Sequence, residues 1–525
     1  MYRKSMCWAL ILAAGVAVAD LPVSQLFKAE GHGRKADGYF PDDDLRRITA
    51  LHDIHTPHVS WASPLAGGPL RILAVAAKTN GRWPVELAQR FDFDVFTVYG
   101  HDTAQLGAPP DKGLFVQGQR DVEARILKAL TADIDVVVSN IAWNALGKRV
   151  QDRITTLRER GIGFVGPTED IDLSGLTPKN ETAAALLAEA VPLSGLRLLG
   201  KNYATPEAAT AEILALWSDN QGTRVADISK YPRDNEKPEF TRLQYQWLPT
   251  SEHEAYYSLF GRVIMWVARR PFHVPRSIKT NELGDFSRDS LPVEFGEPGA
   301  DGNAVRLRLW DADMRLVYES LKPVIPRLAA GKYFVGVESL GEEQFTGWRF
   351  ECIEVTAPSA IAEITLTNRH VSPDATVEAT VRLANLPPKG SLLVFDVLDN
   401  YGRSIYRETR NATQATTFAG PVNESLHLYN YANVKLLDTQ GALLSEMRQG
   451  FYVAQPNAPT DDISLMVWEA CAAFEPFHRR MLRRFAELGA DAALIGARKG
   501  TTNTSQAEAC AMSNVHPLLY VTRLA

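Results

Sequence analysis

Residues 71–77 read RILAVAA, and this short apolar run decides the first part of the fold. A continuous run of Ile, Leu, Val and Ala, without polar alternation, is typical of a strand buried on both faces of a parallel sheet. Two similar runs follow at 95–99 (VFTVY) and 135–139 (DVVVS), and the predicted helices 84–90 and 121–130 lie between the strands. This alternation predicts a doubly wound parallel sheet with helices on both faces.

The helix predicted over residues 144–160 has the clearest pattern. Its apolar residues recur at spacings of four, four and three, and they are Leu146, Val150, Ile154 and Leu157. Gly161 is predicted to end this helix as a C-terminal cap, and Phe164 and Val165 form a fourth short strand. Further strands are expected near 224–228 and 243–247. A last helix has the buried stripe Tyr257, Phe260, Ile264 and Val267.

After Pro271 the helical period disappears and strand-like alternation replaces it. The expected strands are 305–310, 333–337, 348–355, 362–366, 376–383, 392–398 and 434–437. They predict two β-sandwich units with a boundary near residues 357–358. A Pro-containing linker at 455–459 precedes a final strand–helix–strand–helix–strand segment, whose strands are expected at 463–468, 492–495 and 518–521.

Length and charge narrow the classes of function. A chain of 525 residues predicts three or four domains, and a formal net charge of -6 does not indicate a nucleic-acid binder or a polybasic membrane patch. Small molecules, glycans and proteins are left as partners. Residues 1–19 read as a signal peptide: a basic Arg3-Lys4 start, an apolar run too short to span a bilayer, and small residues at Ala17 and Ala19. We therefore expect a secreted or periplasmic protein, cleaved near Ala19, with no membrane span.

The cysteines do not form a disulfide scaffold. Cys7 would leave with the signal peptide, so Cys352, Cys471 and Cys510 remain and permit one bridge at most. Cys471 and Cys510 are the closer pair in the sequence. No CxxC spacing indicates zinc.

Several motifs have a structural explanation as well as a functional one. Residues 161–166 (GIGFVG) match GxGxxG, but they follow a helix and straddle a strand, so a helix cap and a strand end explain them better than a nucleotide site. His253 lies within Ser251-x-x-Glu254, a capping box that starts a helix. A cluster of residue types that can bind metals occurs at His52, Asp53, His55 and His58. We favour the interpretation that these are solvated loop histidines over the interpretation that they form a zinc site. No metal or cofactor site is predicted.

Trp468 and Glu469 end the strand after the linker, and an aromatic ring with a carboxylate at this edge suits a sugar pocket. A core Trp beside a solvated Glu is the structural alternative. No G-x-S-x-G or G-x-C-x-G elbow occurs in the sequence, so a hydrolase or amidotransferase nucleophile of that type is absent. No catalytic residue is predicted.

Two stretches resemble a known family. Residues 58–69 (HVSWASPLAGGP), with the following RILAVAA and VELAQR at 85–90, resemble the start of a class I glutamine-amidotransferase-like domain of exported bacterial proteins. Residues 256–270 (YYSLFGRVIMWVARR) resemble the end of that domain. The resemblance covers about 55–270. In β-galactosidase-like glycoside hydrolases, such a flavodoxin-like domain accompanies a TIM barrel and β-sandwiches.

The expected fold is therefore multidomain α/β plus all-β: a flavodoxin-like doubly wound parallel sheet, two β-sandwich units and a partial (β/α) barrel at the C-terminus. The expected order is a signal peptide (1–19), a loop-rich segment (20–69), the α/β domain (70–270), a β-sandwich (271–357), an Ig-like β-sandwich (358–459) and a barrel start (460–525).

Three functions remain open from the sequence. The first is an exported accessory or truncated portion of a carbohydrate-active, β-galactosidase-like protein, in which the α/β module serves packing or homo-oligomerisation. In the resembled enzymes the two catalytic carboxylates follow later barrel strands, and no position here matches either. The second is a non-enzymatic glycan- or protein-binding protein built on the sandwiches. The third is a degenerate amidotransferase-like sensor with a polar pocket at the carboxyl ends of the α/β strands.

Overall fold

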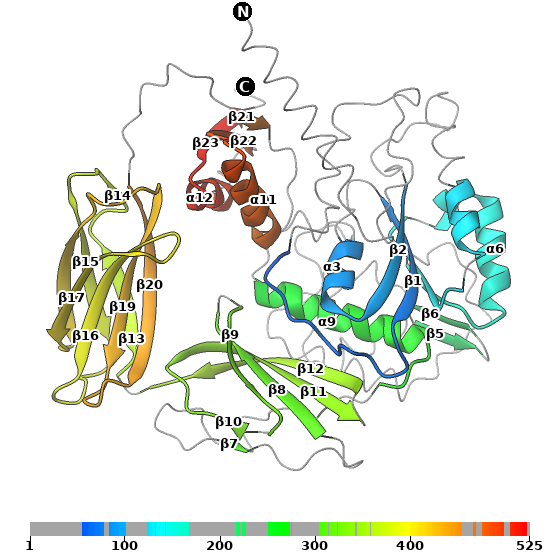
Figure 1. Cartoon of the computed structure of the whole chain (residues 1–525), viewed down its shortest axis with the longest axis horizontal. Coiled ribbons are helices and arrows are strands. Elements are labelled where there is room, and N and C mark those ends of the chain that lie inside the picture. The colour runs from blue at the N-terminus through cyan, green and yellow to red at the C-terminus, as the bar shows by residue number, and fades with distance from the viewer. Residues whose placement is uncertain are drawn as a thin grey trace, which may run out of the picture.

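The computed structural model describes residues 55–77, 83–100, 123–166 except 132 and 142, 217–220, 223–226, 250–272, 275, 293–294, 304–453 with short gaps at 313, 323, 342–343 and 358, 466–468, 475–497 and 504–521. Figure 1 shows a parallel sheet with helices, a small antiparallel sheet, a two-layered β unit and a C-terminal α/β unit. The signal peptide predicted at 1–19 lies outside the described residues. None of the described helices is long and apolar enough to cross a membrane.

The first unit contains a six-stranded sheet in the order β2-β1-β3-β4-β6-β5. Its strands are β1 (Leu70–Ala77), β2 (Phe93–Gly100), β3 (Val136–Ser139), β4 (Gly163–Val165), β5 (Trp217–Asn220) and β6 (Thr223–Ala226). All neighbouring pairs are parallel except β5 with β6. The predicted parallel sheet is therefore confirmed. The strand predicted at 243–247 lies outside the described residues.

Helices cover both faces of this sheet, because β1 buries successive side chains on opposite sides. Ile72, Ala74 and Ala76 pack with α3 (Trp83–Arg90) and α9 (Thr250–Val267). Leu73 and Val75 pack with the helix at 123–129 and with α6 (Lys148–Arg158), which follows the short 3-10 helix η4 (Trp143–Leu146). A strand with two covered faces needs no polar alternation, which explains the continuous apolar sequence.

The GxGxxG motif forms a helix cap and a strand, as the sequence predicts. Gly161 has φ +95°, and its N–H and that of Ile162 donate to the Arg158 and Leu157 carbonyls at the end of α6. A left-handed residue at this position is the usual glycine cap of a helix. Gly163 then begins β4.

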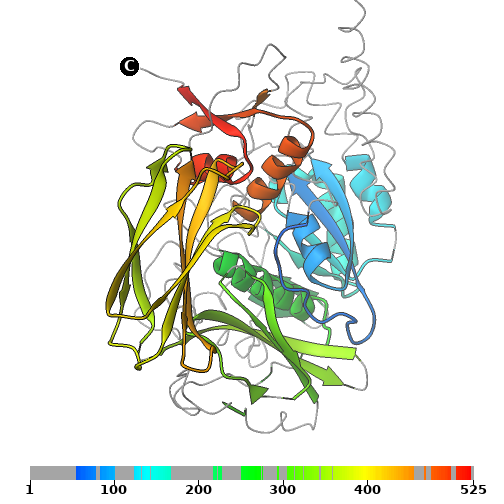
Figure 2. The same ribbon diagram turned by 60° about the vertical axis from the view of Figure 1, so that its left-hand side comes forward.

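A four-stranded antiparallel sheet, ordered β12-β11-β8-β9, lies on the outer side of α9 (Figure 1). Its strands are β8 (Ala304–Trp310), β9 (Leu316–Ser320), β11 (Gly331–Gly341) and β12 (Gln344–Val355). Trp310, Phe334 and Trp348 on one face join the core around α9, and the other face packs with Ile325 of β10 (Val324–Ile325), which pairs with β7 (Val293–Glu294). In the described part of the segment 271–357, where the sequence predicts a sandwich, this sheet packs one face on α9 (Figure 2) and the other on Ile325 of β10.

Helix α9 therefore differs from the one-sided helix that the sequence predicts. The predicted stripe Tyr257, Phe260, Ile264 and Val267 is buried as expected, but every described side chain from 257 to 267 is buried. A helix that is apolar on all sides lies between two layers. Here the layers are the parallel sheet and the four-stranded sheet.

The segment at residues 55–65 also differs from prediction. It belongs to the predicted loop-rich segment 20–69, yet Val59, Trp61 and Leu65 are at most 1% exposed. Trp61 forms a bridge with Phe91, and Leu65 forms one with Phe345. The Trp61 ring lies 6.3 Å from Trp310 and 6.3 Å from Trp348, and it meets Phe350 edge-on at 5.5 Å; all four rings belong to the same core. The segment joins the two layers.

A buried ion network holds this segment on the helical side. Arg90 lies between Glu86 and Glu254, and all three are at most 1% exposed. Burial alone would lower the pKa of Arg90, but the two carboxylates raise it, so the guanidinium stays charged. Thr56 Oγ1 donates to Glu86 Oε2 at 2.8 Å, and Val59 N donates to Glu254 Oε2 at 3.1 Å. Glu254, the acidic residue of the predicted capping box, thus accepts hydrogen bonds from distant partners on both of its oxygens.

A second buried carboxylate holds the segment on the other side. Glu338 accepts from Ala62 N at 2.7 Å and forms ion pairs with Arg306 and Arg308 at 2.6 and 2.8 Å. A segment outside the named strands needs acceptors for its N–H groups, and the two glutamates supply them for Val59 and Ala62.

The next unit is a β-sandwich with its own core. One sheet is ordered β13-β15-β18 and the other β14-β20-β19-β16-β17. The strands are β13 (Ile361–Leu366), β14 (His370–Val371), β15 (Thr376–Leu383), β16 (Leu392–Asp399), β17 (Ser404–Asn411), β18 (Ala415–Pro421), β19 (Tyr429–Leu437) and β20 (Leu443–Val453). Phe395, Phe418 and Phe451 are fully buried between the sheets. The predicted sandwich strands are confirmed here.

The C-terminal unit has three parallel strands in chain order, β21-β22-β23. They are β21 (Met466–Trp468), β22 (Ala492–Ala497) and β23 (His516–Val521), and α11 (Glu475–Glu487) and α12 (Thr504–Met512) connect them. Leu482, Ala493 and Cys510 share a small core between the helices and the sheet. The partner proposed for Cys510, Cys471, lies outside the described residues, so that pairing stays a prediction.

We predict that Trp61→Ala lowers the free energy of unfolding by about 3–5 kcal/mol, the usual cost of deleting a buried aromatic side chain. Urea denaturation followed by far-UV circular dichroism measures it. Leu386→Ala is the control, because Leu386 is 73% exposed. Equal midpoints for both variants would show that Trp61 does not hold the layers together.

We also predict that His58 makes unfolding depend on pH. Burial, and then the nearby Arg90, lower the pKa of His58 from 6.5 to about 4, and its Nδ1 contacts the Thr56 carbonyl oxygen. Because the folded state favours the neutral ring, this stabilisation is complete above pH 6.5 and is lost as the pH falls towards 4. The loss is at most about 3 kcal/mol at 1.36 kcal/mol per pKa unit. His58→Asn should flatten the unfolding profile between pH 6.5 and 4, relative to the wild type.

Candidate functional site

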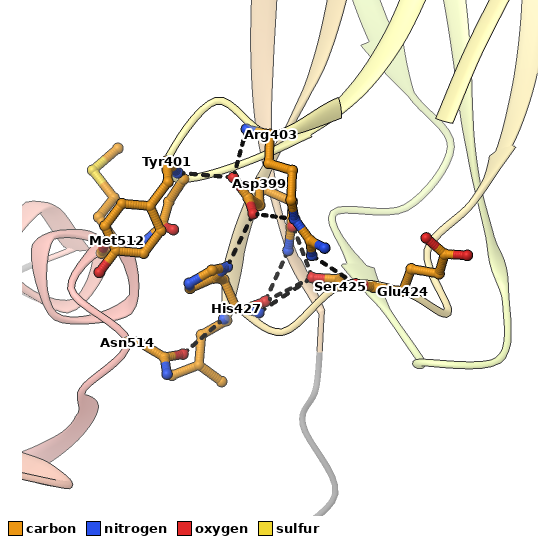
Figure 3. A network of polar contacts seen from close by, with 11 residues as sticks. Asp399, Tyr401, Arg403, Glu424, Ser425, His427, Met512 and Asn514 are labelled. Atoms are coloured by element: carbon orange, nitrogen blue, oxygen red, sulfur yellow. Dashed lines mark hydrogen bonds and ion pairs between the residues drawn. The ribbon is translucent and has the colours of Figure 1, made fainter. Parts of the chain in front are cut away.

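The most extensive polar network around a described histidine lies where the sandwich meets the C-terminal unit (Figure 3). It is built on two loops of the sandwich. One is the β16–β17 hairpin at residues 399–403, and the other is the β18–β19 loop at residues 422–428. Both face the residues that follow α12. We call this region the joint. It consists of the network of Asp399, Tyr401, Arg403, Ser425 and His427, together with the neighbouring Asn400, Leu428 and Tyr429, which contact the C-terminal unit.

Asp399 organises the first loop. Its Oδ1 accepts from the Tyr401 and Arg403 N–H groups at 3.0 and 2.9 Å, and its Oδ2 accepts from Arg403 Nε at 3.0 Å. Burial would raise the pKa of Asp399, but these hydrogen bonds outweigh it and hold the pKa below its ordinary value. Gly402, at φ +82°, donates to the Asp399 carbonyl and completes the turn. A short acidic side chain that binds its own loop is typical turn chemistry.

His427 lies beside this carboxylate. Its Nδ1 is 3.4 Å from Asp399 Oδ2, and its ring meets Tyr401 edge-on at 4.7 Å. Burial is the largest cause lowering the pKa of His427; Asp399 opposes it, and Arg403 and Arg483 reinforce it. The imidazole is therefore neutral at pH 7.

The joint contains the residue types of a hydrolytic triad, but its geometry is different. Ser425 Oγ donates to the His427 carbonyl at 3.1 Å and to Asn430 Oδ1 at 2.8 Å, rather than to the imidazole. In a catalytic triad the nucleophilic hydroxyl donates its proton to the imidazole, and a carboxylate orients that imidazole. Here Asp399 binds Arg403 and loop amides, so the network fixes two loops and does not activate a hydroxyl.

The same loops bind the C-terminal unit directly. Asn400 Nδ2 donates to the Met512 carbonyl, and Leu428 N donates to Asn514 Oδ1 at 3.1 Å. Nearby, the Tyr429 hydroxyl donates to Glu508 on α12. Burial, and then Glu508, raise the pKa of Tyr429. The joint therefore holds α12, and with it the three-stranded parallel sheet, on the end of the sandwich.

The residues singled out from the sequence are not brought together at the joint. Trp468 ends β21, and its backbone pairs with Leu494 of β22. Its side chain, and all of Glu469, lie outside the described residues. His52 and Asp53 lie outside them too, and His55 is exposed. His58, expected to be solvated, is mostly buried beside Arg90. Within the described part of the chain, no three metal-ligating side chains gather.

The carboxyl ends of the α/β strands were the third candidate. Ser139 and Asn140, at the end of β3, are 0% and 6% exposed. Ser139 Oγ bonds to both the N–H and the carbonyl of Ile141, so this hydroxyl closes a turn. Residues 78–82, which follow β1, lie outside the described residues.

No protein-family model matches the sequence, and no curated protein matches it. Solved structures with partial similarity include a glycosyl hydrolase family 2 member from Bacteroides cellulosilyticus. It is 15% identical, the match covers 42% of this chain and 34% of that chain, and the TM-score is 0.22. A putative β-galactosidase from Bacteroides fragilis is 12% identical, with 43% and 44% covered and a TM-score of 0.21. CopC from Methylosinus trichosporium OB3b is 14% identical, with 20% and 98% covered and a TM-score of 0.15.

Parts of glycosidases are thus among the structural neighbours. The chain spans between a third and a half of the length of the two glycosidases, 34% and 44%. TM-scores near 0.2 assign no function to any residue of this chain. The functional interpretation therefore rests on its own contacts.

We predict that Tyr429→Phe loosens the joint, because it removes the hydroxyl that binds Glu508. The expected cost is about 1.5–3 kcal/mol for a hydrogen bond to a charged partner, with faster amide exchange in residues 504–512. Hydrogen–deuterium exchange with mass spectrometry measures it. Tyr406→Phe is the matched control, because the Tyr406 hydroxyl binds Glu408 within the sandwich at 3.3 Å. Equal exchange of α12 in both variants would contradict the role of Tyr429.

Proposed function

We propose that this chain is an exported accessory portion of a carbohydrate-active protein, which binds and presents glycans without cleaving them. The observation that supports this proposal is the arrangement of strands and helices in the C-terminal unit. Its strands are neighbours in chain order, all parallel, and their connecting helices α11 and α12 contact one another on one face. This sequential winding fits the start of a (β/α) barrel, and one half of a doubly wound sheet has the same winding. The resemblance to β-galactosidase-like proteins favours the barrel.

The attachment of this unit supports the proposal. The joint fixes α12 on the sandwich through Asn400, Leu428 and Tyr429, so the two modules have a defined relative orientation. The first unit, whose strands begin in the order β2-β1-β3-β4, is proposed as the flavodoxin-like, amidotransferase-like module. In this proposal it packs against the remaining units and has no catalytic role.

The acidic residues of the C-terminal unit favour binding over catalysis. From residue 463 onward the sequence contains Glu469, Glu475, Glu487, Asp491 and Glu508. Barrel enzymes place their catalytic groups at the carboxyl ends of strands, and of these five only Glu469 follows a strand directly. A retaining glycosidase needs two such carboxyls, about 5–5.5 Å apart. This stretch supplies one.

A second candidate is a non-enzymatic binding protein built on the sandwich. It is favoured by the sandwich core, which is formed by residues 361–453 alone. The candidates differ in the role of Trp468. Trp468→Ala should weaken glycan binding if the barrel-like unit presents the sugar, and it should have no effect if the sandwich alone binds.

We predict that the purified chain is retarded by polysaccharides in affinity electrophoresis and releases no p-nitrophenol from aryl β-glycosides. The reason is the single carboxyl at the strand ends. Turnover that is lost in Glu469→Gln but kept in Glu475→Gln, on α11, would overturn the non-catalytic proposal. Absence of retardation by every polysaccharide would remove the glycan-directed function itself.

A further inference from the structure

The outer face of the five-stranded sandwich sheet carries a row of aromatic and charged side chains along β19 and β20. Ala432 and Val434 of β19 point into the core, so the alternate residues point outward. The outward residues face each other across the two strands. The pairs are Tyr429 with Tyr452, Tyr431 with Gly450, Asn433 with Arg448, and Lys435 with Glu446.

One end of this row is closed by α12. Tyr429 is 5% exposed and its hydroxyl binds Glu508. A Cβ at Gly450 would lie 1.8 Å from that hydroxyl, so glycine is needed for Tyr429 to lie across the sheet. Tyr431 and Tyr452 meet Tyr429 edge-on, each at 5.2 Å. These contacts fix the tyrosines. Beyond Tyr431, Arg448, Lys435 and Glu446 form the open part of the row, whereas Asn433 between them is 3% exposed.

The open part combines cations with hydrogen-bonding groups. The Arg448 guanidinium lies 4.8 Å from the centre of the Tyr431 ring. Lys435 Nζ lies 3.6 Å from Glu446 Oε1, and Asn433 Nδ2 donates to the same oxygen at 3.0 Å. Arg448 is exposed, and the side chains of Lys435 and Glu446 are 39% and 42% exposed. Two cations therefore accompany one carboxylate, in a chain of net charge -6.

We propose that this face, formed by Tyr431, Lys435, Glu446 and Arg448, binds an acidic oligosaccharide, a ligand class that rests on the glycan-directed function proposed above. The partly exposed Tyr431 ring offers an apolar surface to a sugar ring. Glu446 offers an acceptor for sugar hydroxyl groups, and the buried Asn433 holds its carboxylate in place. Arg448 and Lys435 offer charge-assisted hydrogen bonds to a carboxylate or sulfate, and these are stronger than neutral ones.

Other partners fit this row less well. A protein partner requires a central apolar patch, and here the apolar groups are tyrosine rings separated by charges. An anionic membrane requires a cluster of four to eight basic residues, and this row has two. A carboxylated or sulfated sugar chain matches the mixture of ring, carboxylate and cation.

The test compares polygalacturonate with its fully methyl-esterified form, using the full chain and isothermal titration calorimetry. The two polymers share a backbone and differ in carboxylate charge. The wild type should bind polygalacturonate, more weakly as NaCl rises, and should bind the esterified form at least tenfold more weakly. Arg448→Ala should lower the affinity for polygalacturonate about tenfold or more, as expected for a charged hydrogen bond.

Arg382→Ala is the matched control. Arg382 lies on β15 of the opposite sheet, its side chain is 64% exposed, and it pairs with Glu363 at 2.8 Å. Its loss should leave binding unchanged. Tyr431→Phe keeps the ring and should retain most of the affinity. Circular dichroism melting shows whether each variant is folded.

The possible outcomes separate the two proposals. Equal loss in the Arg448 and Arg382 variants, or equal affinity for both polymers, would overturn the acidic-glycan face. Binding of neutral glycans that Arg448→Ala does not change would also overturn it, while the glycan-directed function would stand. If no glycan binds, both proposals fail.

Discussion

The burial of Trp61 between the parallel sheet and the four-stranded sheet is the contact on which the first half of the molecule depends. The segment around Trp61 lies outside the named strands, so its N–H groups need acceptors from elsewhere in the chain. Glu254 and Glu338 accept from Val59 and Ala62. Each buried carboxylate in turn needs a cation, which Arg90 supplies on one side and Arg306 and Arg308 on the other. Because breaking a buried ion pair is costly, no layer can be removed without destabilising the next.

One consequence concerns the organisation of domains. A single hydrophobic core runs from Val59 through β1 and α9 to Phe350. It includes residues on both sides of position 270, where the change from helical to strand-like period suggests a boundary. The α/β sheet and the four-stranded sheet thus share a core, whereas the sandwich at 361–453 buries its own side chains.

The sequence revealed the parts of the fold that depend on local patterns. The apolar run of β1, the stripe of α6 and its Gly161 cap, and the alternation of β15 and β16 all appear at their predicted places. The segment at 55–65 shows no period, because its contacts are distant: Val59 to Glu254 spans 195 residues and Ala62 to Glu338 spans 276. Glu254 satisfies a local motif by its letters, yet a long-range partner determines its position. No local rule predicts that choice.

The joint escaped sequence reasoning for a similar reason. The hairpin at 399–403 has turn-forming residues, but nothing in them indicates that Asn400 binds the end of α12 more than a hundred residues later. Ser425, His427 and Asp399 show in addition that residue types alone do not define chemistry. The hydroxyl donates to a backbone carbonyl, and the carboxylate is held by an arginine. Whether such residues can catalyse a reaction depends on which acceptor each donor group bonds to.

The outer face of β19 and β20 links the joint to the proposed glycan-binding face. The same row of side chains contacts α12 at one end and is exposed to solvent further along. At one end, Gly450 allows Tyr429 to lie across the sheet and reach Glu508, which fixes α12. Further along the same strands, Tyr431 and Arg448 remain partly open to solvent. A ligand bound there would lie on the same strand as the tyrosine that orients the barrel-like unit. The sandwich would then be more than a spacer, since the surface that positions the C-terminal unit would continue into the surface that holds the sugar chain.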